Sequence, residues 1–303
     1  METIKIGILG LGTVGSGVIR ILRDHAEKIS NITGRRLEVK TVVVHNLKKK
    51  RSVDLTGINL TDNADDVLCD DEIQMVVEVM GTVNIAKEYI ERALKAGKHV
   101  ITANKDLIAT HGPELISLAK EHGCDLCYEA SVAGGIPILR TIVNSFAADR
   151  IIEVRGIVNG TTNYIMTQMN KNGASYEDAL ESAQELGFAE ADPTNDVDGI
   201  DAAYKMIILT QFAFGKDVTM DQVKVKGIRG IQKADIAEAK RLGYVIKLLG
   251  IAKLVNGHID VSVGPVLVPQ SQPLAAIQNE NNAVVVTGSA VGETMFYGPG
   301  AGK

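Results

Sequence analysis

The chain has 303 residues, of which 45% are hydrophobic and 23% are charged, and its formal net charge is −5. At roughly 150 residues per domain, this length predicts two domains with a sizeable core. A negative chain does not suit general nucleic-acid binding, which requires a basic face. No apolar run reaches the roughly 18 residues of a membrane helix, and the N-terminus reads as a strand rather than a signal peptide. We therefore expect a cytoplasmic protein whose partners are small molecules or copies of itself, not nucleic acid or a membrane.

Cysteines and histidines do not indicate a metal or disulfide framework. Cys69, Cys124 and Cys127 are too few to brace a chain of this length, and they fit a reducing compartment. Cys124 and Cys127 form a C-x2-C without a second pair, so we expect no zinc site there. The six histidines match no metal-binding spacing.

The first part of the chain alternates β-branched runs with helical patterns. We expect strands at Ile4 to Leu9, Leu37 to Val44, Met75 to Met80, His99 to Thr102 and Leu126 to Glu129, and a helix at Asn84 to Ala96. Buried strands joined by helical crossovers predict a parallel, doubly wound Rossmann-type sheet, and hence the α/β class. We assign residues 1–133 to this dinucleotide-binding domain.

The alternation changes at the glycine-rich segment 133–137. Beyond it we expect helices at Ile138 to Phe146, Thr162 to Met169, Tyr176 to Leu186, Gly199 to Phe214 and Ala234 to Leu242, and strands at Ile151 to Val158, Val245 to Leu254, Ile259 to Val268 and Ala283 to Ser289. This mixture predicts an α+β second domain. We assign residues 134–290 to substrate binding and dimerisation, and expect 291–303 to return toward the nucleotide domain.

The first predicted strand runs into Gly10-Leu11-Gly12-Thr13-Val14-Gly15 and then into an apolar helical face. Gly10 permits a tight turn, Gly12 leaves room for a pyrophosphate, and Gly15 lets the helix press on the sheet. Free N–H groups at the helix start would face the anion. This strand, glycine loop and helix favour dinucleotide binding over a simple glycine turn.

The second predicted strand lacks the acidic residue that usually binds the ribose hydroxyls, because His45 and Asn46 follow Val44. Without a carboxylate to repel it, a 2′-phosphate could be met by His45 and by the basic stretch from Lys48 to Arg51. By itself that stretch is typical of a solvated loop. The pattern slightly favours NADP over NAD as the cofactor.

Nine acidic residues and no Lys or Arg lie between Lys171 and Lys205. Four of them are on a predicted helix and are expected to form a solvated face: Glu177, Asp178, Glu181 and Glu185. The other five are Glu190, Asp192, Asp196, Asp198 and Asp201. Asp201 lies one helical turn before Lys205, and the helix then becomes too apolar for a surface position. Lys205 is therefore expected to be partly buried beside carboxylates.

Two interpretations of Lys205 remain open at this point. The lysine could form a structural ion pair. Partial burial could also make it a tunable proton donor, next to carboxylates that would attract a substrate ammonium group.

Two further polar clusters follow predicted strands. Thr102-Ala103-Asn104-Lys105 lies after the fourth parallel strand, at the edge where open α/β sheets bind ligands, although Lys105 could also be a surface lysine. Asn159-Gly160-Thr161-Thr162-Asn163 joins a strand to a helix. It would cap that helix, or present hydroxyl and N–H groups to a ligand.

These motifs together resemble homoserine dehydrogenases. The resemblance covers the whole chain and is carried by Gly10 to Gly15, Thr102 to Lys105, Tyr128 to Pro137, Asn159 to Asn163, Glu190 to Lys205 and Phe296 to Gly302. It implies an NAD(P)-dependent oxidoreductase that interconverts L-homoserine and L-aspartate 4-semialdehyde, in threonine, methionine and isoleucine biosynthesis. It also implies a homodimer.

The resemblance implies roles for residues of the second domain. Lys205 resembles the catalytic acid/base, Glu190 and Asp201 resemble the groups that bind homoserine, and Asp196 resembles a nearby carboxylate. Gly160 and Thr161 join the expected substrate-binding set. In this mechanism Lys205 transfers the proton.

Three further sets of contacts are implied. Lys105 resembles a second active-site lysine that touches cofactor and substrate and helps by position and charge, although the opposite assignment of the two lysines stays open. Glu129 and the backbone carbonyls of Val132, Gly134 and Ile136 resemble the family's sodium site, which oxygen ligands suit. Besides Lys105, the expected cofactor contacts are Gly10, Gly12, Thr13, Val14, Gly15, His45, Gly81, Thr82, Gly187 and Gly302.

This chain departs from the family pattern in two places. Relatives often carry Arg and then Asp where His45 and Asn46 stand here. Relatives also continue beyond the position of Lys303 into a helix, and many add a regulatory ACT domain, so we expect a longer protein.

Two alternative functions fit the same fold. One is another Rossmann dehydrogenase of amino-acid-like substrates, and the other is a dinucleotide-sensing regulator without chemistry. Absence of Lys205 or Lys105 would favour the regulator, and both lysines are present.

Overall fold

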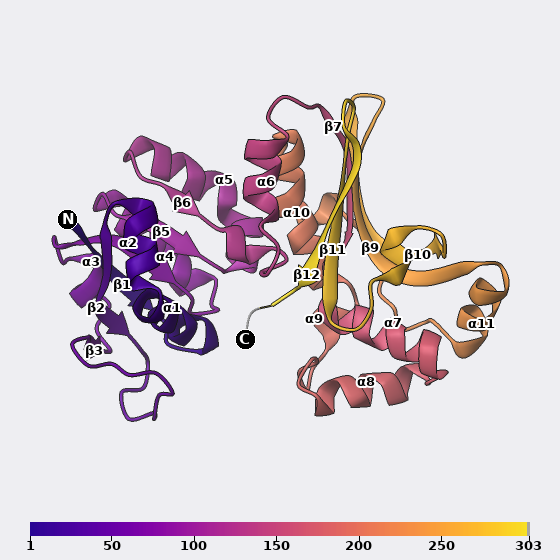
Figure 1. Cartoon of the computed structure of the whole chain (residues 1–303), viewed down its shortest axis with the longest axis horizontal. Coiled ribbons are helices and arrows are strands. Elements are labelled where there is room, and N and C mark those ends of the chain that lie inside the picture. The colour runs from indigo at the N-terminus through magenta and orange to yellow at the C-terminus, as the bar shows by residue number, and fades with distance from the viewer. Residues whose placement is uncertain (302–303) are drawn as a thin grey trace. The chain divides into compact units, whose positions relative to one another are not determined.

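The computed structural model describes residues 1–301 and contains two compact units (Figure 1). The first unit comprises Met1–Ser131, and the second begins at Val132. The sequence predicts a boundary after residue 133, within the same short segment. No helix among residues 1–301 is both long enough and apolar enough to cross a membrane.

The first unit is a six-stranded sheet with the strand order β3-β2-β1-β4-β5-β6, and every recorded pairing in it is parallel. Its strands are β1 (Thr3–Leu9), β2 (Arg36–Val43), β3 (Asn59–Thr61), β4 (Ile73–Glu78), β5 (His99–Thr102) and β6 (Leu126–Cys127). Its helices are α1 (Thr13–Asp24), α2 (Ala26–Thr33), α3 (Asp65–Leu68), α4 (Asn84–Lys95), α5 (Lys105–Glu121) and the 3-10 turn η1 (Glu129–Ser131).

Both faces of this sheet are covered. Leu9 of β1 belongs to an apolar cluster formed with α4 and α5, whereas its neighbour Ile8 belongs to a second cluster that includes Ile19 of α1. Successive residues of a strand point to opposite faces, so these clusters are the two sides of one sheet. This confirms the predicted doubly wound α/β domain, and its five predicted strands are present.

The second unit has a mixed six-stranded sheet with the order β12-β11-β7-β9-β10-β8, in which β8 pairs in parallel and the other pairings are antiparallel. Its strands are β7 (Ile151–Ile157), β8 (Lys224–Val225), β9 (Tyr244–Val255), β10 (His258–Pro269), β11 (Asn281–Gly288) and β12 (Gly292–Pro299). Its helices are α6 (Ile138–Ser145), α7 (Gly160–Asn172), α8 (Tyr176–Glu185), α9 (Thr194–Val197), α10 (Ile200–Phe214), α11 (Lys233–Arg241), η2 (Met220–Gln222) and η3 (Pro273–Ala276). The predicted α+β class is confirmed.

Helix α10 lies against one face of the second sheet. The side chain of Met206 on α10 fills the space above Gly250 of β9, so closely that a Cβ at Gly250 would be 2.3 Å from Met206 Cγ. On the opposite face, Leu249 of β9 packs with Leu274 and Ile277 near η3. The two faces of the sheet are therefore covered by different layers. Lys205 belongs to α10, which forms one of these layers.

Most of the segment 291–303 forms a strand. Residues Gly292–Pro299 form β12, an edge strand that pairs antiparallel with β11, so this part of the segment extends the second sheet. The alternating exposure of this strand is typical of a sheet edge. The sequence alone does not identify this segment as a strand. Its pairing with β11, across the turn between Gly288 and Gly292, shows that the two strands form a hairpin.

Candidate active site

In the first unit, the glycine loop has the geometry that the motif predicts. Gly10 adopts a φ of +102°, and a Cβ there would lie 2.7 Å from the carbonyl oxygen of Val79. A Cβ at Gly15 would meet the carbonyl oxygen of Gly10 at 2.3 Å. At Gly12, in contrast, an added Cβ would meet no atom of a non-adjacent residue within 4 Å among residues 1–301. Gly10 and Gly15 thus permit close packing of β1, α1 and β4, and Gly12 keeps open space at the start of α1 for a ligand.

A cleft of about 600 Å³ opens beside this loop. Its lining includes Gly10, Gly12, His45, Thr82 and Tyr89, which come from the ends of β1, β2 and β4 and from α4. The carboxyl ends of parallel strands are where doubly wound sheets bind nucleotides. The structure therefore brings His45 and Thr82 to the cleft that the glycine loop borders.

The basic stretch after β2 folds back onto the glycine loop. The Arg51 guanidinium donates to the carbonyl oxygens of Leu11 at 3.0 Å and Asn46 at 2.7 Å, and its Nε is buried without a partner among the described residues. A recess of about 340 Å³ next to α1 is lined by Thr13, Ser16, Arg20, Lys49, Lys50 and Arg51 among others. This stretch is therefore not a detached solvated loop, and it puts positive charge at the start of α1.

One acidic residue also lines the cleft. Asp62 follows β3 and is exposed, and it lies on the cleft wall with Lys49 and Arg51. The sequence pattern places such a residue at the end of β2, so Asp62 is not predicted from it. Because β3 is a short three-residue strand that pairs in parallel with β2, its end reaches the same edge of the sheet.

A buried carboxyl group organises the ends of β4 and β5. Glu78 accepts from the Thr102 hydroxyl at 2.7 Å and from the N–H of Met80 at 2.8 Å. Burial raises the pKa of this carboxyl above its ordinary range. Thr102 in turn accepts from the N–H of Asn104, which caps α5. Through this chain of bonds Glu78 fixes the turn that presents Lys105.

Lys105 is the first residue of α5, and its side chain is about one-third exposed. The amide of Asn104 accepts from the N–H of Leu107 and donates to the carbonyl oxygen of Thr82. The N-cap therefore ties Lys105 to the strand end that carries Gly81 and Thr82. Gly81 is exposed with a φ of +75°, which suits this turn.

In the second unit, Lys205 forms the predicted pair with Asp201. Its Nζ lies 2.7 Å from Asp201 Oδ2 and donates at 2.8 Å to the carbonyl oxygen of Val158, at the end of β7. The lysine side chain is only 14% exposed. The expectation of a partly buried lysine beside a carboxylate, one helical turn away, is confirmed.

Asn159 joins this pair to a second carboxylate. Its side-chain nitrogen donates to Asp196 at 2.7 Å and to Asp201 at 2.8 Å, while its oxygen accepts from the N–H and the hydroxyl of Thr162. Burial raises the pKa of Asp196, the hydrogen bond from Asn159 opposes this, and the like charge of Asp201 adds to it. We call Asn159, Asp196, Asp201 and Lys205 the Lys205 cluster.

Two family models match the chain. Residues 10–129 match the NAD-binding domain of homoserine dehydrogenase, and residues 137–303 match the homoserine dehydrogenase domain that follows it. The homoserine dehydrogenase of Bacillus subtilis (strain 168) is 54% identical over 303 residues, covering all of this chain and 70% of that protein. The chain belongs to the homoserine dehydrogenase family. It is therefore an oxidoreductase with a domain that binds a nicotinamide dinucleotide.

Solved structures of homoserine dehydrogenases agree with this assignment. The enzyme from Thiobacillus denitrificans has a TM-score of 0.97 and 44% identity, covering all of this chain and 70% of that one. A hyperthermophilic archaeal homoserine dehydrogenase in complex with NADPH has a TM-score of 0.80 and 27% identity, covering 99% of this chain and 93% of that one.

The residues expected from the homoserine dehydrogenase pattern in the second unit are only partly brought together. Asp196, Asp201 and Lys205 share one hydrogen-bonded cluster through Asn159. Thr161 is buried and donates to the carbonyl oxygen of Phe188, so its hydroxyl ties α7 to the segment after α8.

Glu190 and Gly187 lie in that segment. Both are exposed, Gly187 has a φ of +75°, and the Glu190 carbonyl oxygen accepts from Gln184. Within residues 1–301, no recorded hydrogen bond links the Glu190 side chain to the Lys205 cluster. The four acids of α8 are exposed, as predicted.

The loop expected to hold sodium is tightly turned. Ala133 adopts a φ of +48°, the N–H of Ile136 donates to the Ala133 carbonyl oxygen, and the N–H of Gly134 donates to Gly300. Val132, Gly134 and Ile136 belong to this turn, and Glu129 lies in η1 of the first unit. Gly302, an expected cofactor contact, lies outside the described residues.

Several functional residues are not predictable from the sequence. The sequence predicts that Asn159 caps a helix, which is confirmed, but it does not predict the bonds of Asn159 to two distant carboxylates. Asp198, in a stretch without Lys or Arg, pairs with Arg229 at 2.5 Å. Glu78 ends the otherwise apolar strand β4. A charged residue in such a strand is the sequence feature that could have predicted its role.

Proposed function

We propose that this chain catalyses the reversible oxidation of L-homoserine to L-aspartate 4-semialdehyde with Lys205 as the acid/base, and so serves threonine, methionine and isoleucine biosynthesis. The observation that supports it is the Lys205 cluster, a half-buried lysine beside two carboxylates in a member of this family. Residues 1–133 would bind the dinucleotide and 134–290 the substrate. The nicotinamide ring, when bound, accepts the hydride from the alcohol carbon or returns it to the aldehyde.

The bonds of Lys205 suit proton transfer to and from the substrate oxygen. A protonated lysine has three N–H donors, and the described residues take two of them, at Val158 and Asp201. The third N–H would point its proton at the carbonyl oxygen of the aldehyde and release it as negative charge develops there. In the opposite direction the neutral amine takes the proton from the alcohol. Val158 and Asp201 hold Nζ in one place throughout.

The carboxylates would recognise the amino end of the substrate. The Lys205 cluster places the carboxylates of Asp196 and Asp201 on either side of the Asn159 amide, with the Lys205 ammonium on Asp201. The α-ammonium of homoserine would bind Asp201 and Asp196 together with Glu190 from the exposed segment. Gly160 and Thr161 would line the same site. The first turn of α7 offers N–H groups to the substrate carboxylate.

We propose Lys105 as a positioning and electrostatic residue that touches cofactor and substrate. Its place at the first position of α5, fixed by Asn104 and Thr102, supports this assignment. The start of a helix is a favourable place to hold an anion, and a lysine there adds charge. Separate replacement of the two lysines by alanine distinguishes their roles.

NADP is the proposed cofactor. Lys49, Lys50, Arg20 and Arg51 gather around the start of α1, where they can meet a 2′-phosphate, and a relative of the same family has been solved with NADPH. Asp62 on the cleft wall opposes this preference by like charge. Gly10, Gly12, Thr13, Val14, Gly15, His45, Gly81, Thr82, Gly187 and Gly302 are the other proposed contacts. The proposal thus rests on the balance of these charges.

One assay tests both substrate and cofactor. Homoserine-dependent reduction of NADP and of NAD is followed by the absorbance of the reduced nicotinamide. We expect turnover with homoserine and a lower KM for NADP. Protein that binds NADPH but oxidises no homoserine would overturn the enzyme assignment and favour a dinucleotide sensor. A strong NAD preference that persists in His45→Arg would show that the charge argument is wrong.

We also propose a sodium site at Glu129 and the carbonyls of Val132, Gly134 and Ile136. One carboxylate and three carbonyl oxygens suit a hard cation, and the positive φ of Ala133 turns successive carbonyls of this loop in different directions. The ion would rigidify the loop. Raising sodium at constant ionic strength should increase the Tm of the wild type, and Glu129→Gln should lose that increase.

A homodimer is proposed through the face of the second sheet opposite α10. Strand pairing places Met295, Val285, Arg155 and Ile251 in one row across that face, and Tyr297 beside them is 69% exposed. An exposed aromatic next to half-buried apolar residues indicates a protein contact. Light scattering should give a dimer for the wild type and a smaller mass for Tyr297→Asp. A dimer in both would exclude this face.

A further inference from the structure

A lysine lies in the core of the second unit. Lys247 is in the middle of β9 and only 2% exposed. Its ammonium donates to the side-chain oxygen of Asn163 on α7 at 2.9 Å and to the carbonyl oxygen of Ile277. Within residues 1–301, no carboxylate forms an ion pair with it. Lys247 is thus a buried cation held by neutral oxygens alone.

This arrangement is unfavourable for stability. Burial lowers the pKa of Lys247 to about 8, and the like charge of Lys171 on α7 adds to the effect. A methionine could fill a similar volume without desolvating a charge. Stability therefore does not explain why a lysine occupies position 247, and its hydrogen bonds indicate a different role.

The bonds of Lys247 converge on the segment 277–281, which connects η3 to β11. Asn163 donates from its side-chain nitrogen to the carbonyl oxygens of Asn279 at 2.9 Å and Asn281 at 3.1 Å. Thr167 accepts from the N–H of Asn279 at 3.0 Å. Lys247 orients the Asn163 amide, because its ammonium can bond only to the oxygen of that amide. The segment is therefore fastened to α7 by a chain of bonds that starts at Lys247.

The same segment abuts the first residue of α7. A Cβ at Gly160 would lie 2.7 Å from the carbonyl oxygen of Glu280, so the two backbones are in direct contact. Gly160, Asn163 and Thr167 are spaced by three and four residues and share one face of the helix. Segment 277–281 therefore supports the first two turns of α7 along that face.

The start of α7 contributes Asn159 to the Lys205 cluster. Its N-cap, Asn159, holds the first turn through Thr162 and bridges Asp196 and Asp201 through its side-chain nitrogen. A displacement of the helix start would move Asn159 and change the spacing of the two carboxylates. Catalytic and binding geometry is sensitive to shifts of about 1 Å.

We propose that Lys247 is a positioning residue for the homoserine site: through Asn163 and Ile277 it locks segment 277–281 against α7, and so fixes Asn159 and the two carboxylates that Asn159 bridges. The proposal rests on the function proposed above. Lys247 itself does not touch the substrate.

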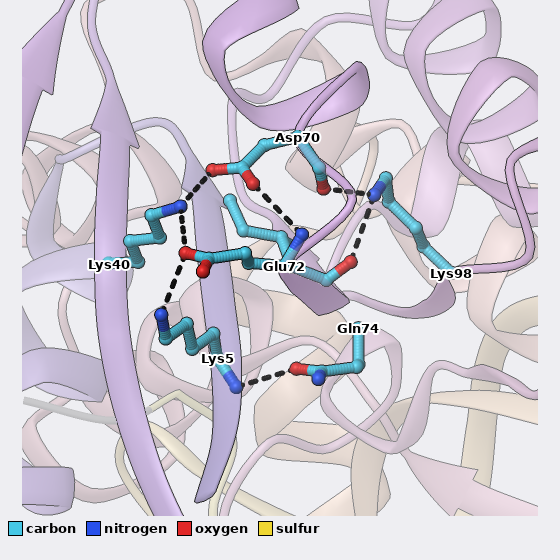
Figure 2. Close-up of polar contacts among 7 residues, drawn as sticks. Lys5, Lys40, Asp70, Glu72, Gln74 and Lys98 are labelled. Carbon is cyan, nitrogen blue, oxygen red and sulfur yellow. Dashed lines mark hydrogen bonds and ion pairs between the residues drawn. The ribbon is translucent and has the colours of Figure 1, made fainter.

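The test replaces Lys247 by methionine and compares it with a matched control. Lys98 of the first unit is also a buried lysine, 3% exposed, that donates to two backbone carbonyls, those of Asp70 and Ile73 (Figure 2). Lys98→Met therefore imposes the same kind of loss in the other unit. For wild type and both variants, kcat, the KM for homoserine, the KM for NADP and the Tm are measured.

We expect Lys247→Met to raise the KM for homoserine at least about fivefold while the KM for NADP stays within about twofold. Lys98→Met should leave both KM values near those of the wild type. An unchanged homoserine KM in folded Lys247→Met would overturn the proposal, as would an equal change in both KM values. A wild type that does not oxidise homoserine would instead overturn the proposed function.

A milder variant covers the case in which Lys247→Met does not fold. Thr167→Val keeps the volume and removes only the hydroxyl that accepts from Asn279. It should raise the homoserine KM in the same direction by a smaller factor. If Thr167→Val folds and the homoserine KM equals that of the wild type, the segment does not position the site.

Discussion

The two units each contain a cluster of lysines and carboxylates, and the clusters differ in burial. In the first unit, Lys40 bridges Asp70 at 2.5 Å and Glu72 at 2.6 Å, and Lys5 also pairs with Glu72 at 2.7 Å (Figure 2). We call this the Lys40 cluster. Its two lysines match its two carboxylates. In the Lys205 cluster, one lysine faces two carboxylates.

Their electrostatic behaviour differs accordingly. The hydrogen bond from Lys40 lowers the pKa of Asp70, and those from Lys40 and Lys5 lower that of Glu72, so both carboxylates are stabilised in their charged form. Burial raises the pKa of Asp196 instead. The proposed homoserine site therefore differs from the Lys40 cluster in the burial and in the pKa of its carboxylates.

The largest effect is expected for Lys205→Ala. Loss of a general acid/base should reduce kcat by about 10²- to 10⁴-fold, with cofactor affinity nearly unchanged. Lys105→Ala should change cofactor affinity as well as turnover. Steady-state kinetics and NADPH titration of both variants separate the two lysines. Near-normal turnover in Lys205→Ala would contradict the mechanism, and the Lys205 cluster would then be a structural network like the Lys40 cluster.

The second effect concerns pH and stability. The pKa of Lys247 is about 8 in the folded protein, against 10.5 ordinarily, so the unfolded chain binds more protons between these pH values. The free energy of unfolding should therefore rise as pH increases from about 8 to 10.5, by roughly 3 kcal/mol at ~1.4 kcal/mol per pKa unit. Below pH 8 this contribution is constant and unfavourable.

Urea unfolding of wild type and Lys247→Met across this pH range isolates the contribution, because the other lysines are common to both. The difference between the two proteins should shrink as pH rises. Lys98 gives the comparison: burial lowers its pKa, but Asp70 and Asp71 oppose the change. Lys98→Met should show a weaker pH dependence, and an equal or stronger one would refute the role of neighbouring charge.

A third prediction tests the charge of Asp196 directly. Asp196→Asn keeps the shape of the side chain and removes its charge, so the KM for homoserine should rise about tenfold with little change in kcat. In the wild type the same KM should rise as pH falls through the raised pKa of Asp196, because protonation removes the charge. That rise should be weaker in Asp196→Asn. An unaltered pH profile would exclude Asp196 as a substrate contact.

The smallest effect is expected for Lys40→Met, in the Lys40 cluster. The Lys40 side chain is one-third exposed, and salt bridges near the surface contribute little. Thermal melts should show a small loss of stability, and the kinetic constants should match those of the wild type. A large change in the KM for homoserine in Lys40→Met would contradict a purely structural role for the Lys40 cluster.

Local patterns in the sequence determined most of the secondary structure and part of the site. The β-branched runs, the glycine loop and the four-residue spacing of Asp201 and Lys205 are all short-range features, and each produced the predicted element or contact. Burial of Lys205 followed from the apolar residues after it on α10. Such inferences succeed because helix and strand periods relate neighbours in the chain to neighbours in space.

Tertiary structure alone decided the contacts between distant segments. Asn159 reaches Asp201 across 42 positions, Arg229 meets Asp198 across 31, and Lys247 meets Asn163 across 84. Asp62 reaches the nucleotide cleft only because β3 adds to the edge of the first sheet. A hydrogen bond depends on the final path of two backbones and on an unpaired partner being present there. Neither can be inferred from the spacing of residues in one segment. The contacts of Asn159, Arg229 and Lys247 are therefore known only from the folded chain.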